Sequence, residues 1–239
     1  MTHYDIIGDV HGCYSELCAL LAALGHGEHA ADREPARQLV FLGDLTDRGP
    51  DSVGVLRMVM GLVEEGRAIC LRGNHDDKLA RKLAGRSVNV THGLESTLVE
   101  LAHEPPAFSR RVLSFLQSLE SYYILDEGRL VVAHAGIKEG MIGEHSGKIH
   151  AFTLYGDTTG KFDAHGLPIR RDWAADYRGT ATIVYGHTPV HAPGWVNNTI
   201  NIDTGCVFGG SLTALRYPER ELVSVPARKV YYERAGFGT

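Results

Sequence analysis

Long apolar runs are missing from this sequence of 239 residues. A membrane-spanning helix needs roughly 18 or more consecutive apolar residues, and no stretch approaches that length. The first residues, from Met1 to Asp5, also lack the basic segment and the apolar segment that together mark a signal peptide. We therefore expect a protein without a membrane partner, located in the cytoplasm.

Cysteine and excess charge are both scarce. The 4 cysteines occur at no C-x-x-C spacing, which favours reduced thiols in a chain without a signal peptide. The formal net charge is −5 and no long basic block is present, so an extended nucleic-acid surface is not expected. An anionic ligand would have to be held by a few local arginines and by metal ions. Nothing in the pattern indicates an oligomeric state.

The most informative stretch of the chain is GDLTDRG, from Gly43 to Gly49. It follows the apolar run QLVFL, which has the composition of a buried strand that ends at the glycine. Asp44, Asp47 and Arg48 thus lie close together after a strand end. Burying such charges unpaired would cost several kcal/mol each. A metal ion on the carboxylates and a phosphate on Arg48 would offset that cost.

Four other short motifs also close predicted strands: GDVHG at 8–12, GNHD at 73–76, AHAG at 133–136 and GHT at 186–188. In α/β sheets, ligands gather at the carboxyl ends of the strands. Mixed nitrogen and oxygen ligands suit Mn²⁺, Fe or Zn²⁺ better than Ca²⁺ or Mg²⁺. Any one motif could equally be a capped turn or a hydrogen-bonded core histidine, whereas their joint occurrence favours a metal site. The candidate ligands are Asp9, His11, Asp44, Asn74, His134 and His187.

Hydrophobic periodicity predicts helices that alternate with strands up to residue 119, and mostly strands after it. The expected helices are 14–24, 52–65 (capped by Asp51 or Ser52), 76–83, 97–102 and 109–119. The expected strands are 4–9, 39–42, 68–71, 122–125, 129–133, 182–185, 199–202, 212–217 and 221–225. Residues 25–36 should form a loop, 136–179 an irregular functional region with a short helix near 145–155, and the last residues a loose tail. Without a linker or repeat, we predict one α/β domain over residues 1–239, a sandwich with mixed sheets.

The ordered motifs GDVHG, GDLTDRG, GNHD, AHAG and YGHT resemble those of the calcineurin-like metallophosphoesterase superfamily. Within it, GDLTDRG and RGNH resemble the phosphoprotein phosphatase family. This resemblance implies a four-layer αββα sandwich, the metallophosphoesterase fold, in which helices flank two mixed β-sheets. It also implies two adjacent divalent transition-metal ions, with Mn²⁺ favoured and Ni²⁺, Co²⁺, Fe or Zn²⁺ as alternatives.

The resemblance also assigns six metal ligands, of which two bind the first ion, one bridges both ions and three bind the second. In that order they are Asp9 and His11, then Asp44, then Asn74, His134 and His187. Many superfamily members have a further histidine two residues after the last ligand, where this chain has Pro189. Water is therefore expected to complete the coordination of the first ion.

Three later segments narrow the resemblance: LYGDTTG at 154–160, RRDWAADY at 170–177 and IDTGCVFGG at 202–210. They resemble PrpE-type asymmetrical bis(5′-nucleosyl)-tetraphosphatases and the phosphatase module of bacterial polynucleotide kinase-phosphatases. The sequence has no kinase P-loop, which favours the stand-alone type. Eukaryotic-type protein phosphatases carry Glu at the position of Asp76 and lack IDTGCVFGG, which disfavours a phosphoprotein substrate.

Further residues are expected to act on the substrate, with Arg48, Asn74 and His75 contacting its phosphate. Arg48 would fork onto two phosphoryl oxygens, and an ion pair with Asp47 is the alternative. His75 would protonate the leaving group while Asp47 orients it and favours the imidazolium; a neutral hydrogen-bond donor is the alternative. Asp203 would hold a histidine or a water molecule, or cap a strand end.

Two assignments stay open. A second phosphate contact could come from Arg170, Arg171 or Arg178, for which surface ion pairs are the competing explanation. A nucleobase could stack on Tyr155 or Tyr177, for which core packing is the competing explanation.

Four functions compete for a chain that carries this set of residues. The first is hydrolysis of dinucleoside polyphosphates, with in-line attack by a metal-bridging hydroxide that splits diadenosine tetraphosphate into ATP and AMP. The second is a broad phosphomonoesterase or 2′,3′-cyclic phosphodiesterase, and the third a phosphoprotein Ser/Thr/Tyr phosphatase. The fourth, a non-catalytic binding module, is disfavoured because every expected ligand is present. We expect a small phosphorylated substrate, a nucleotide in the first case.

Overall fold

The computed structural model describes residues 2–26, 36–163 and 168–234. Its first half contains β1 (His3–Ile7), α1 (Tyr14–Leu24), β2 (Arg37–Phe41), α2 (Ser52–Glu64), β3 (Ala68–Cys70), α3 (Asn74–Leu83), α4 (Leu94–Ala102) and α5 (Pro106–Ser118). Its second half contains β4 (Tyr122–Leu125), β5 (Leu130–Ala133), α6 (Gly147–Tyr155), β6 (Thr158–Phe162), β7 (Pro168–Arg170), α7 (Trp173–Asp176), β8 (Thr182–Tyr185), β9 (Trp195–Val196), β10 (Thr199–Asn201), β11 (Ser211–Tyr217) and β12 (Glu221–Pro226). Short 3₁₀ helices are η2 (Asp126–Gly128), η3 (Glu139–Met141) and η4 (Cys206–Phe208).

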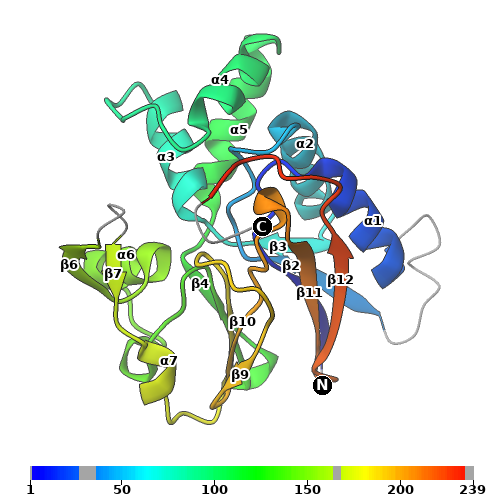
Figure 1. Ribbon diagram of the computed structural model, residues 1–239. Helices are drawn as coiled ribbons and strands as arrows, with labels where there is room; N and C mark the ends of the chain where they lie inside the picture. The colour runs from blue at the N-terminus through cyan, green and yellow to red at the C-terminus, as the bar shows by residue number, and fades with distance from the viewer. Residues whose placement is uncertain (1, 27–35, 164–167, 235–239) are drawn as a thin grey trace.

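Two five-stranded mixed sheets form the frame of the molecule (Figure 1). The first has the order β12-β11-β1-β2-β3; β1, β2 and β3 are parallel, β11 is antiparallel to β1, and β12 is antiparallel to β11. The second has the order β4-β5-β8-β10-β9, with a parallel centre and antiparallel edge strands. A separate hairpin is formed by β6 and β7. The parallel centre of each sheet brings successive strand ends to one edge.

Alternate residues of the central strands face different cores, because successive side chains of a strand point to opposite sides. In β1, Ile6 lies in the core between the two sheets, whereas Ile7 lies in the core under α1 and α2. The middle core also receives Val132 and Val184 from the second sheet. A third core, which includes Phe152, joins the outer face of the second sheet to α6 and α7 (Figure 1). The order helix, sheet, sheet, helix confirms the predicted four-layer αββα sandwich.

The predicted helices are confirmed, although several begin earlier than expected. Asp51 caps α2, since its carboxylate accepts the Gly54 N–H at 2.7 Å. The α3 helix begins at Asn74 rather than at 76 because the Asp76 carboxylate accepts the free N–H of Gly73 at 3.0 Å. The α5 helix begins at Pro106 rather than at 109, and proline suits a first helical turn. In the part of the chain that the structure describes, no helix is long and apolar enough to span a membrane.

The prediction for residues 136–179 was partly wrong. The short helix is confirmed as α6, but this stretch also contains the β6–β7 hairpin and the short helix α7. The hairpin contains glycine and charged residues and most of its side chains are exposed, so its sequence lacks the apolar pattern that predicts a strand. The two-residue strand β9 was also missed. The predicted loop at 25–36 lies mostly outside the described residues.

The prediction of a loose tail was wrong for residues 227–234, which lie against the body of the protein. Ala227 donates its N–H to the Gly210 carbonyl at 2.8 Å, and Tyr231 donates its N–H to the Val207 carbonyl at 3.0 Å. The polar backbone of this segment therefore has partners in distant parts of the chain, which no local sequence signal reveals. The rest of the tail lies outside the described residues.

Candidate active site

The predicted metal ligands lie on loops that follow central strands of both sheets. Asp9 and His11 lie on the loop after β1, and Asp44 lies on the loop after β2. Asn74 is the first residue of α3, which follows β3, and the loops after β5 and β8 carry His134 and His187. Backbone bonds join neighbouring loops: the N–H groups of Val10 and His11 both donate to the Asp44 carbonyl, at 3.2 and 2.8 Å. Gly186 likewise donates to the His134 carbonyl at 2.7 Å. Five chain segments are thereby held at one edge of the sandwich.

The loop after β2 depends on a glycine. Gly43 has φ +94, which L side chains rarely adopt, and a Cβ there would overlap the backbone of Gly73. Asp44 itself has φ 50, and His11 and His187 have φ 45 and 73. Left-handed conformations at non-glycine residues store strain and cluster at functional sites. Close approach of the β2 and β3 loops therefore requires Gly43.

Gly43→Ala is expected to lower the free energy of unfolding by about 3 kcal/mol or more, because both the left-handed conformation and the close contact disfavour a Cβ. Gly61→Ala is the matched control: Gly61 lies inside α2 with no atom near its Cβ position. There alanine should stabilise the helix by about 0.5–1 kcal/mol. Denaturant unfolding measures both changes, and a loss of similar size in the two variants would contradict this assignment.

Three side-chain atoms that can serve as metal ligands converge at the second predicted ion position. His134 Nδ1 lies 3.0 Å from the Leu42 carbonyl oxygen, so this nitrogen carries the proton and Nε2 carries a lone pair. That Nε2 lies 3.0 Å from Asn74 Oδ1 and 3.1 Å from His187 Nδ1. The last two atoms are 2.8 Å apart. A cation bound by all three atoms would explain why they gather at such distances.

Asp44 stands between the two predicted ion positions. Its Oδ2 lies 3.5 Å from His11 Nε2 and 3.5 Å from His134 Nε2. His11 Nδ1 donates to the Thr46 carbonyl at 2.9 Å, which leaves a lone pair on Nε2. The other carboxylate oxygen, Oδ1, accepts the His75 N–H at 2.9 Å. Asp44 Oδ2 is therefore placed to bridge two ions.

Among the described residues, two groups of three side chains could hold a metal ion, because their ligand atoms lie within 4.8 Å of one another. One group is Asp44, His134 and His187, and the other is His11, Asp44 and His75. Asp9 belongs to neither group. Its carboxylate is buried and accepts the His187 N–H at 3.1 to 3.2 Å. The sixth predicted ligand thus lies at the site and contacts the loop of another ligand.

Asp76 is a residue of the site whose role the motif analysis missed. Its fully buried carboxylate accepts N–H groups from Asp44 at 2.7 Å, Leu45 at 3.1 Å and Gly73 at 3.0 Å. It therefore ties the loop that carries Asp44 to the loop that carries Asn74. An acidic residue three positions after a glycine at a helix start was the available signal.

Burial makes the negative charge of the carboxylates costly and disfavours protonated imidazoles at the same site. Burial raises the pKa of Asp44 to about 7, and burial with Asp203 and Asp44 nearby raises the pKa of Asp9 well above its usual value. Burial also lowers the pKa of His134 to about 4 and the pKa of His187 well below its usual value. The carboxylates therefore require positive charge that the imidazoles do not supply as protons. Divalent ions satisfy both groups, and the nitrogen and oxygen donors fit transition metals.

His75 and Asp47 form the predicted pair. His75 Nδ1 lies 2.6 Å from Asp47 Oδ2, and the Thr97 hydroxyl donates to Asp47 Oδ1 at 2.6 Å. Burial and the nearby Arg48 guanidinium lower the pKa of His75 well below its usual value. Burial raises the pKa of Asp47 to about 6. Both shifts act against the imidazolium that was expected for this pair.

Arg48 lies over the first predicted ion position rather than in an ion pair. Its Nη1 is 2.7 Å from His11 Nε2. Among the described residues, no carboxylate lies within ion-pair distance of Arg48, and the carboxylate of Asp47 is taken by His75 and Thr97. Its guanidinium is therefore available to an anion at the centre.

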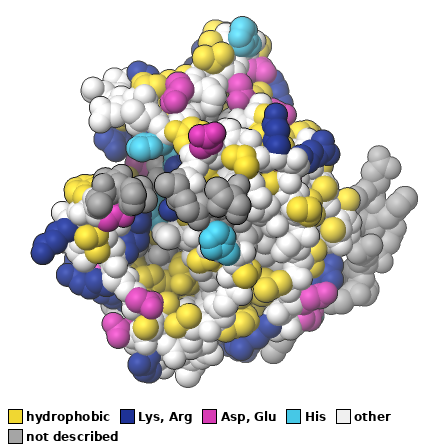
Figure 2. Space-filling model, viewed as in Figure 1, with side chains coloured by type: hydrophobic (Ala, Val, Ile, Leu, Met, Phe, Trp, Pro, Cys, Tyr) yellow, Lys and Arg dark blue, Asp and Glu magenta, His cyan; other side chains and the backbone are white. Residues whose placement is uncertain are grey.

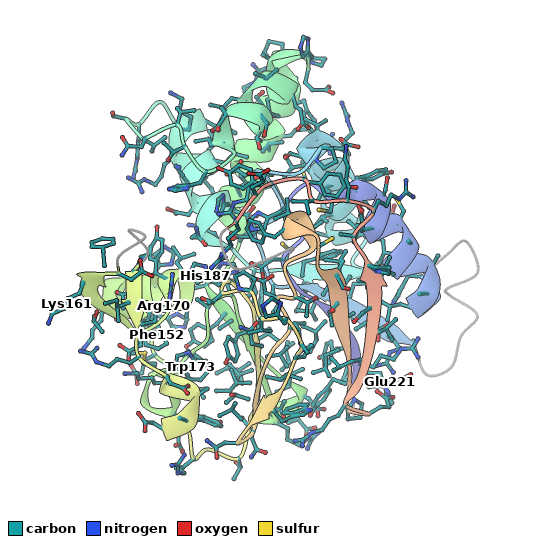
Figure 3. The ribbon with its side chains drawn as sticks, in the orientation of Figure 1. Phe152, Lys161, Arg170, Trp173, His187 and Glu221 are labelled. Carbon is teal, nitrogen blue, oxygen red and sulfur yellow. The ribbon has the colours of Figure 1, made fainter. Side chains whose placement is uncertain are left out.

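Of the three candidates for a second phosphate contact, only Arg170 reaches the centre. Its Nη2 lies 2.8 Å from His187 Nε2, and Figure 3 shows the two labelled side chains close together. Arg171 pairs with Asp157 at 3.1 Å, while Arg178 donates to nearby carbonyls. Figure 2 shows Lys and Arg side chains gathered on the left of the view, where the β6–β7 hairpin lies in Figure 1.

The two tyrosines that were candidates for stacking on a nucleobase differ in their exposure. Tyr177 is buried in the core beside α7, and its hydroxyl donates to the Ala181 carbonyl at 2.9 Å. Tyr155 is exposed at the end of α6, and its carbonyl accepts from Arg170 Nε at 3.0 Å. Of these two residues, only Tyr155 is accessible for stacking on a nucleobase.

The Asp203 carboxylate accepts the Gly205 N–H at 3.0 Å, as a strand-end cap would, and Asp203 also lines the cleft.

The cleft at these loops is lined by His11, Asp44, Arg48, Asn74, His75, His187, Pro189, Asp203, Phe208 and Arg234. Most of these residues were predicted from strand-end motifs. Arg234 was not, because it stands in no motif typical of a metal or phosphate site, and Pro189 and Phe208 were noted in the sequence without a role in the cleft. The cleft combines cation ligands with arginines that can hold an anion.

A helix–sheet–sheet–helix fold with these ligands and arginines at its strand ends is that of a metal-dependent phosphohydrolase. The family model described as "Calcineurin-like phosphoesterase" matches residues 3–220, and the chain belongs to this family. Membership makes it an enzyme that hydrolyses phosphate esters or anhydrides with divalent metal ions.

Two bacterial proteins that are about half identical to this chain share the same name. A protein of Anoxybacillus flavithermus is 52% identical over 234 residues, which cover 95% of this chain and 96% of that protein. A Bacillus subtilis protein is 50% identical over 236 residues, covering 96% of this chain and 97% of that protein. Both are named "Bis(5'-nucleosyl)-tetraphosphatase PrpE [asymmetrical]".

Solved structures agree with the fold. One described as "a putative diadenosine tetraphosphatase" superposes with a TM-score of 0.69 at 27% identity, covering 95% of this chain and 94% of that chain. A protein serine/threonine phosphatase from Saccharomyces cerevisiae has a TM-score of 0.62 at 14% identity, covering 98% of this chain and 80% of that chain. The second likeness shows the fold alone.

Proposed function

We propose that this enzyme splits dinucleoside tetraphosphates such as diadenosine tetraphosphate unevenly, into ATP and AMP, with two divalent transition-metal ions and a preference for Mn²⁺. The observation that supports a dinuclear centre is the position of Asp44 Oδ2, which lies 3.5 Å from a ring nitrogen of His11 and 3.5 Å from one of His134. The substrate follows from the relatives that are about half identical over nearly the whole chain. The nitrogen and oxygen ligand set supports a transition metal.

The ions would be held by Asp9 and His11, by Asp44 between them, and by Asn74, His134 and His187. When bound, they supply an activated water nucleophile and stabilise charge on the phosphoryl oxygens. Arg48 holds two phosphoryl oxygens with its guanidinium fork, because no carboxylate among the described residues competes for it. Arg170, beside His187, is the second arginine that reaches the substrate. Asn74 and His75 border the same phosphoryl group, and Asp203 positions the loop that follows it.

His75 protonates the leaving-group oxygen in this proposal. Asp47 fixes the ring through the 2.6 Å contact to Nδ1, so Nε2 is the atom that can carry the proton to the substrate. Burial and Arg48 lower the pKa of His75 in the protein alone. A bound phosphate offsets the charge of Arg48 and favours protonation of the ring, because an adjacent anion stabilises the imidazolium.

We also infer that residues 1–239 form one domain that works in the cytoplasm. The core between the sheets takes side chains from Tyr4 near one end of the chain and Tyr217 near the other, which supports a single unit. The cysteines are unpaired, and Cys13, Cys70 and Cys206 are buried, which suits a reducing compartment.

A substrate panel tests the proposed function. The protein is assayed with diadenosine tetraphosphate, a 2′,3′-cyclic nucleotide, an aryl phosphate and a phosphopeptide, each with Mn²⁺ and with a chelator. We expect chelation to abolish turnover, Mn²⁺ to restore it, and kcat/KM to be highest for the tetraphosphate, since specificity is a ratio of these values. Product analysis should give equal amounts of ATP and AMP. A higher kcat/KM for the cyclic nucleotide or the phosphopeptide would replace the proposed substrate with one of the alternatives.

A further inference from the structure

The segment at residues 227–234, which we call the C-terminal arm, crosses the protein close to the cleft. Figure 1 shows it (red) leaving β12 and passing over η4 toward α3. Tyr231 and Tyr232 both donate their N–H groups to the Val207 carbonyl, at 3.0 Å each. The arm is therefore attached to η4, whose last residue, Phe208, lines the cleft.

A buried carboxylate fixes the course of the arm. Glu16 on α1 is only 1% exposed, and its Oε1 accepts the Arg228 N–H at 3.0 Å and the Tyr231 hydroxyl at 2.8 Å. Burial and the Glu16 carboxylate raise the pKa of Tyr231, so its hydroxyl keeps the proton that it donates. A carboxylate buried without such donors would be costly. The contact therefore holds the arm in one place.

Arg234, the last described residue of the arm, lines the cleft. Its guanidinium carbon lies 5.3 Å from the centre of the Phe208 ring, and that of Arg48 lies at the same 5.3 Å. Among the described residues, no carboxylate or hydrogen-bond acceptor contacts the Arg234 guanidinium. Burial and the nearby charge of Arg48 disfavour the Arg234 guanidinium, and the Asp203 carboxylate offsets only part of this cost. A bound anion would offset both terms.

The two arginines line the same cleft but differ in their contacts to the predicted metal ligands. Arg48 reaches the predicted ligand His11 directly, at 2.7 Å. Arg234 makes no hydrogen bond to a predicted ligand, and the Phe208 ring is the side chain that it shares with Arg48. Arg234 therefore stands beside Arg48 in the cleft without contacting the predicted metal ligands.

We propose that Arg234 binds a second phosphate of the substrate, adjacent to the phosphoryl group at the metal centre, and so makes the cleft selective for chains of linked phosphates over phosphomonoesters. This inference rests on the proposed phosphohydrolase site and specifies how it recognises its substrate class. Glu16 and Tyr231 act as positioning residues, because they hold the arm without reaching the cleft.

The test measures inhibition constants for inorganic tripolyphosphate and for orthophosphate during hydrolysis of an aryl phosphate, with free Mn²⁺ buffered. Arg234→Gln is expected to raise the tripolyphosphate constant about tenfold, as loss of one charge-assisted contact does. The orthophosphate constant should change less than about twofold. Arg228→Gln is the matched control, since it removes an exposed charge from the same arm and should change neither constant. Thermal melting confirms that each variant is folded.

An unchanged tripolyphosphate constant in Arg234→Gln, or an equal rise for both inhibitors, would overturn the proposal. Tyr231→Phe leaves Arg234 in place but removes a bond from Glu16, and should raise the tripolyphosphate constant in the same direction. No change in that variant would reject the positioning role of the arm. Because the assay substrate is an aryl phosphate, failure to cleave dinucleoside tetraphosphates would reject the proposed substrate without affecting this comparison.

Discussion

Asp44→Asn is expected to lower kcat/KM at least about a thousandfold while the protein stays folded. The carboxylate oxygen Oδ2 lies 3.5 Å from both His11 Nε2 and His134 Nε2, so it is the atom that can join two ions. An amide can keep its one oxygen toward the His75 N–H, and a neutral NH₂ group then takes the place of the bridging anion. Losing the bridge removes several kcal/mol of transition-state stabilisation, and each 1.4 kcal/mol or so is tenfold in rate.

Metal content distinguishes this cause from a general loss of structure. We expect Asp44→Asn to retain fewer than two ions per chain after dialysis against limiting Mn²⁺, with an unchanged circular dichroism spectrum. Asp176→Asn is the matched control, because Asp176 is an exposed carboxylate on α7. It should keep both wild-type turnover and wild-type metal content. Wild-type turnover in Asp44→Asn would reject the dinuclear centre.

The same variant should be more stable than the wild type in chelator at high pH. Burial raises the pKa of Asp44 to about 7 from a usual value of 3.8. Between these two pH values the metal-free folded protein keeps a proton on Asp44 that the unfolded chain has released. Stability of the metal-free wild type therefore falls as pH rises from about 4 to about 7. Asparagine has no such dependence, and its advantage should reach a few kcal/mol near pH 8 and vanish below about pH 4. Thermal unfolding at both pH values measures the difference.

Local sequence signals were enough to predict most ligands of the proposed metal centre. Asp44 and His134 each follow an apolar run typical of a buried strand, and the carboxyl ends of parallel strands meet at one edge. The six proposed ligands are therefore visible as separate local signals. Their convergence is a consequence of sheet topology, which the strand–helix pattern already restricts.

The parts that could not be predicted depend on contacts between distant residues. Arg234 reaches the cleft because the arm is bonded to distant residues, among them Glu16, which lies more than two hundred residues before its partner Tyr231. The β6–β7 hairpin is exposed, so it lacks the apolar alternation that marks a half-buried strand. Asp76 could be predicted as a helix-start residue, but its two bonds to the Asp44 loop depend on how β2 and β3 pair.

His75→Asn is expected to lower kcat by about 10²–10⁴-fold for an alkyl phosphate, the range typical of a lost general acid. The asparagine amide can still donate to Asp47, so the variant removes the Nε2 proton while keeping the buried contact. The need for that proton depends on the leaving group. An alkoxide is a strong base and leaves slowly without protonation, whereas a nitrophenolate or a phosphate is a weak base. We therefore expect a fall of only about tenfold for nitrophenyl phosphate, with a tetraphosphate nearer to the aryl ester than to the alkyl ester.

The pH profile separates proton donation from simple positioning. If His75 acts as the acid, wild-type kcat for the alkyl phosphate falls as pH rises through the pKa of the bound imidazolium, because only the protonated ring is active. His75→Asn should lose this limb, while His103→Asn, a change at an exposed histidine after α4, should keep it. Asp47→Asn should shift the limb to lower pH, since the carboxylate 2.6 Å from Nδ1 stabilises the charged ring. An equal loss of kcat for alkyl and aryl phosphates, with the alkaline limb intact, would make His75 a phosphate-positioning residue instead.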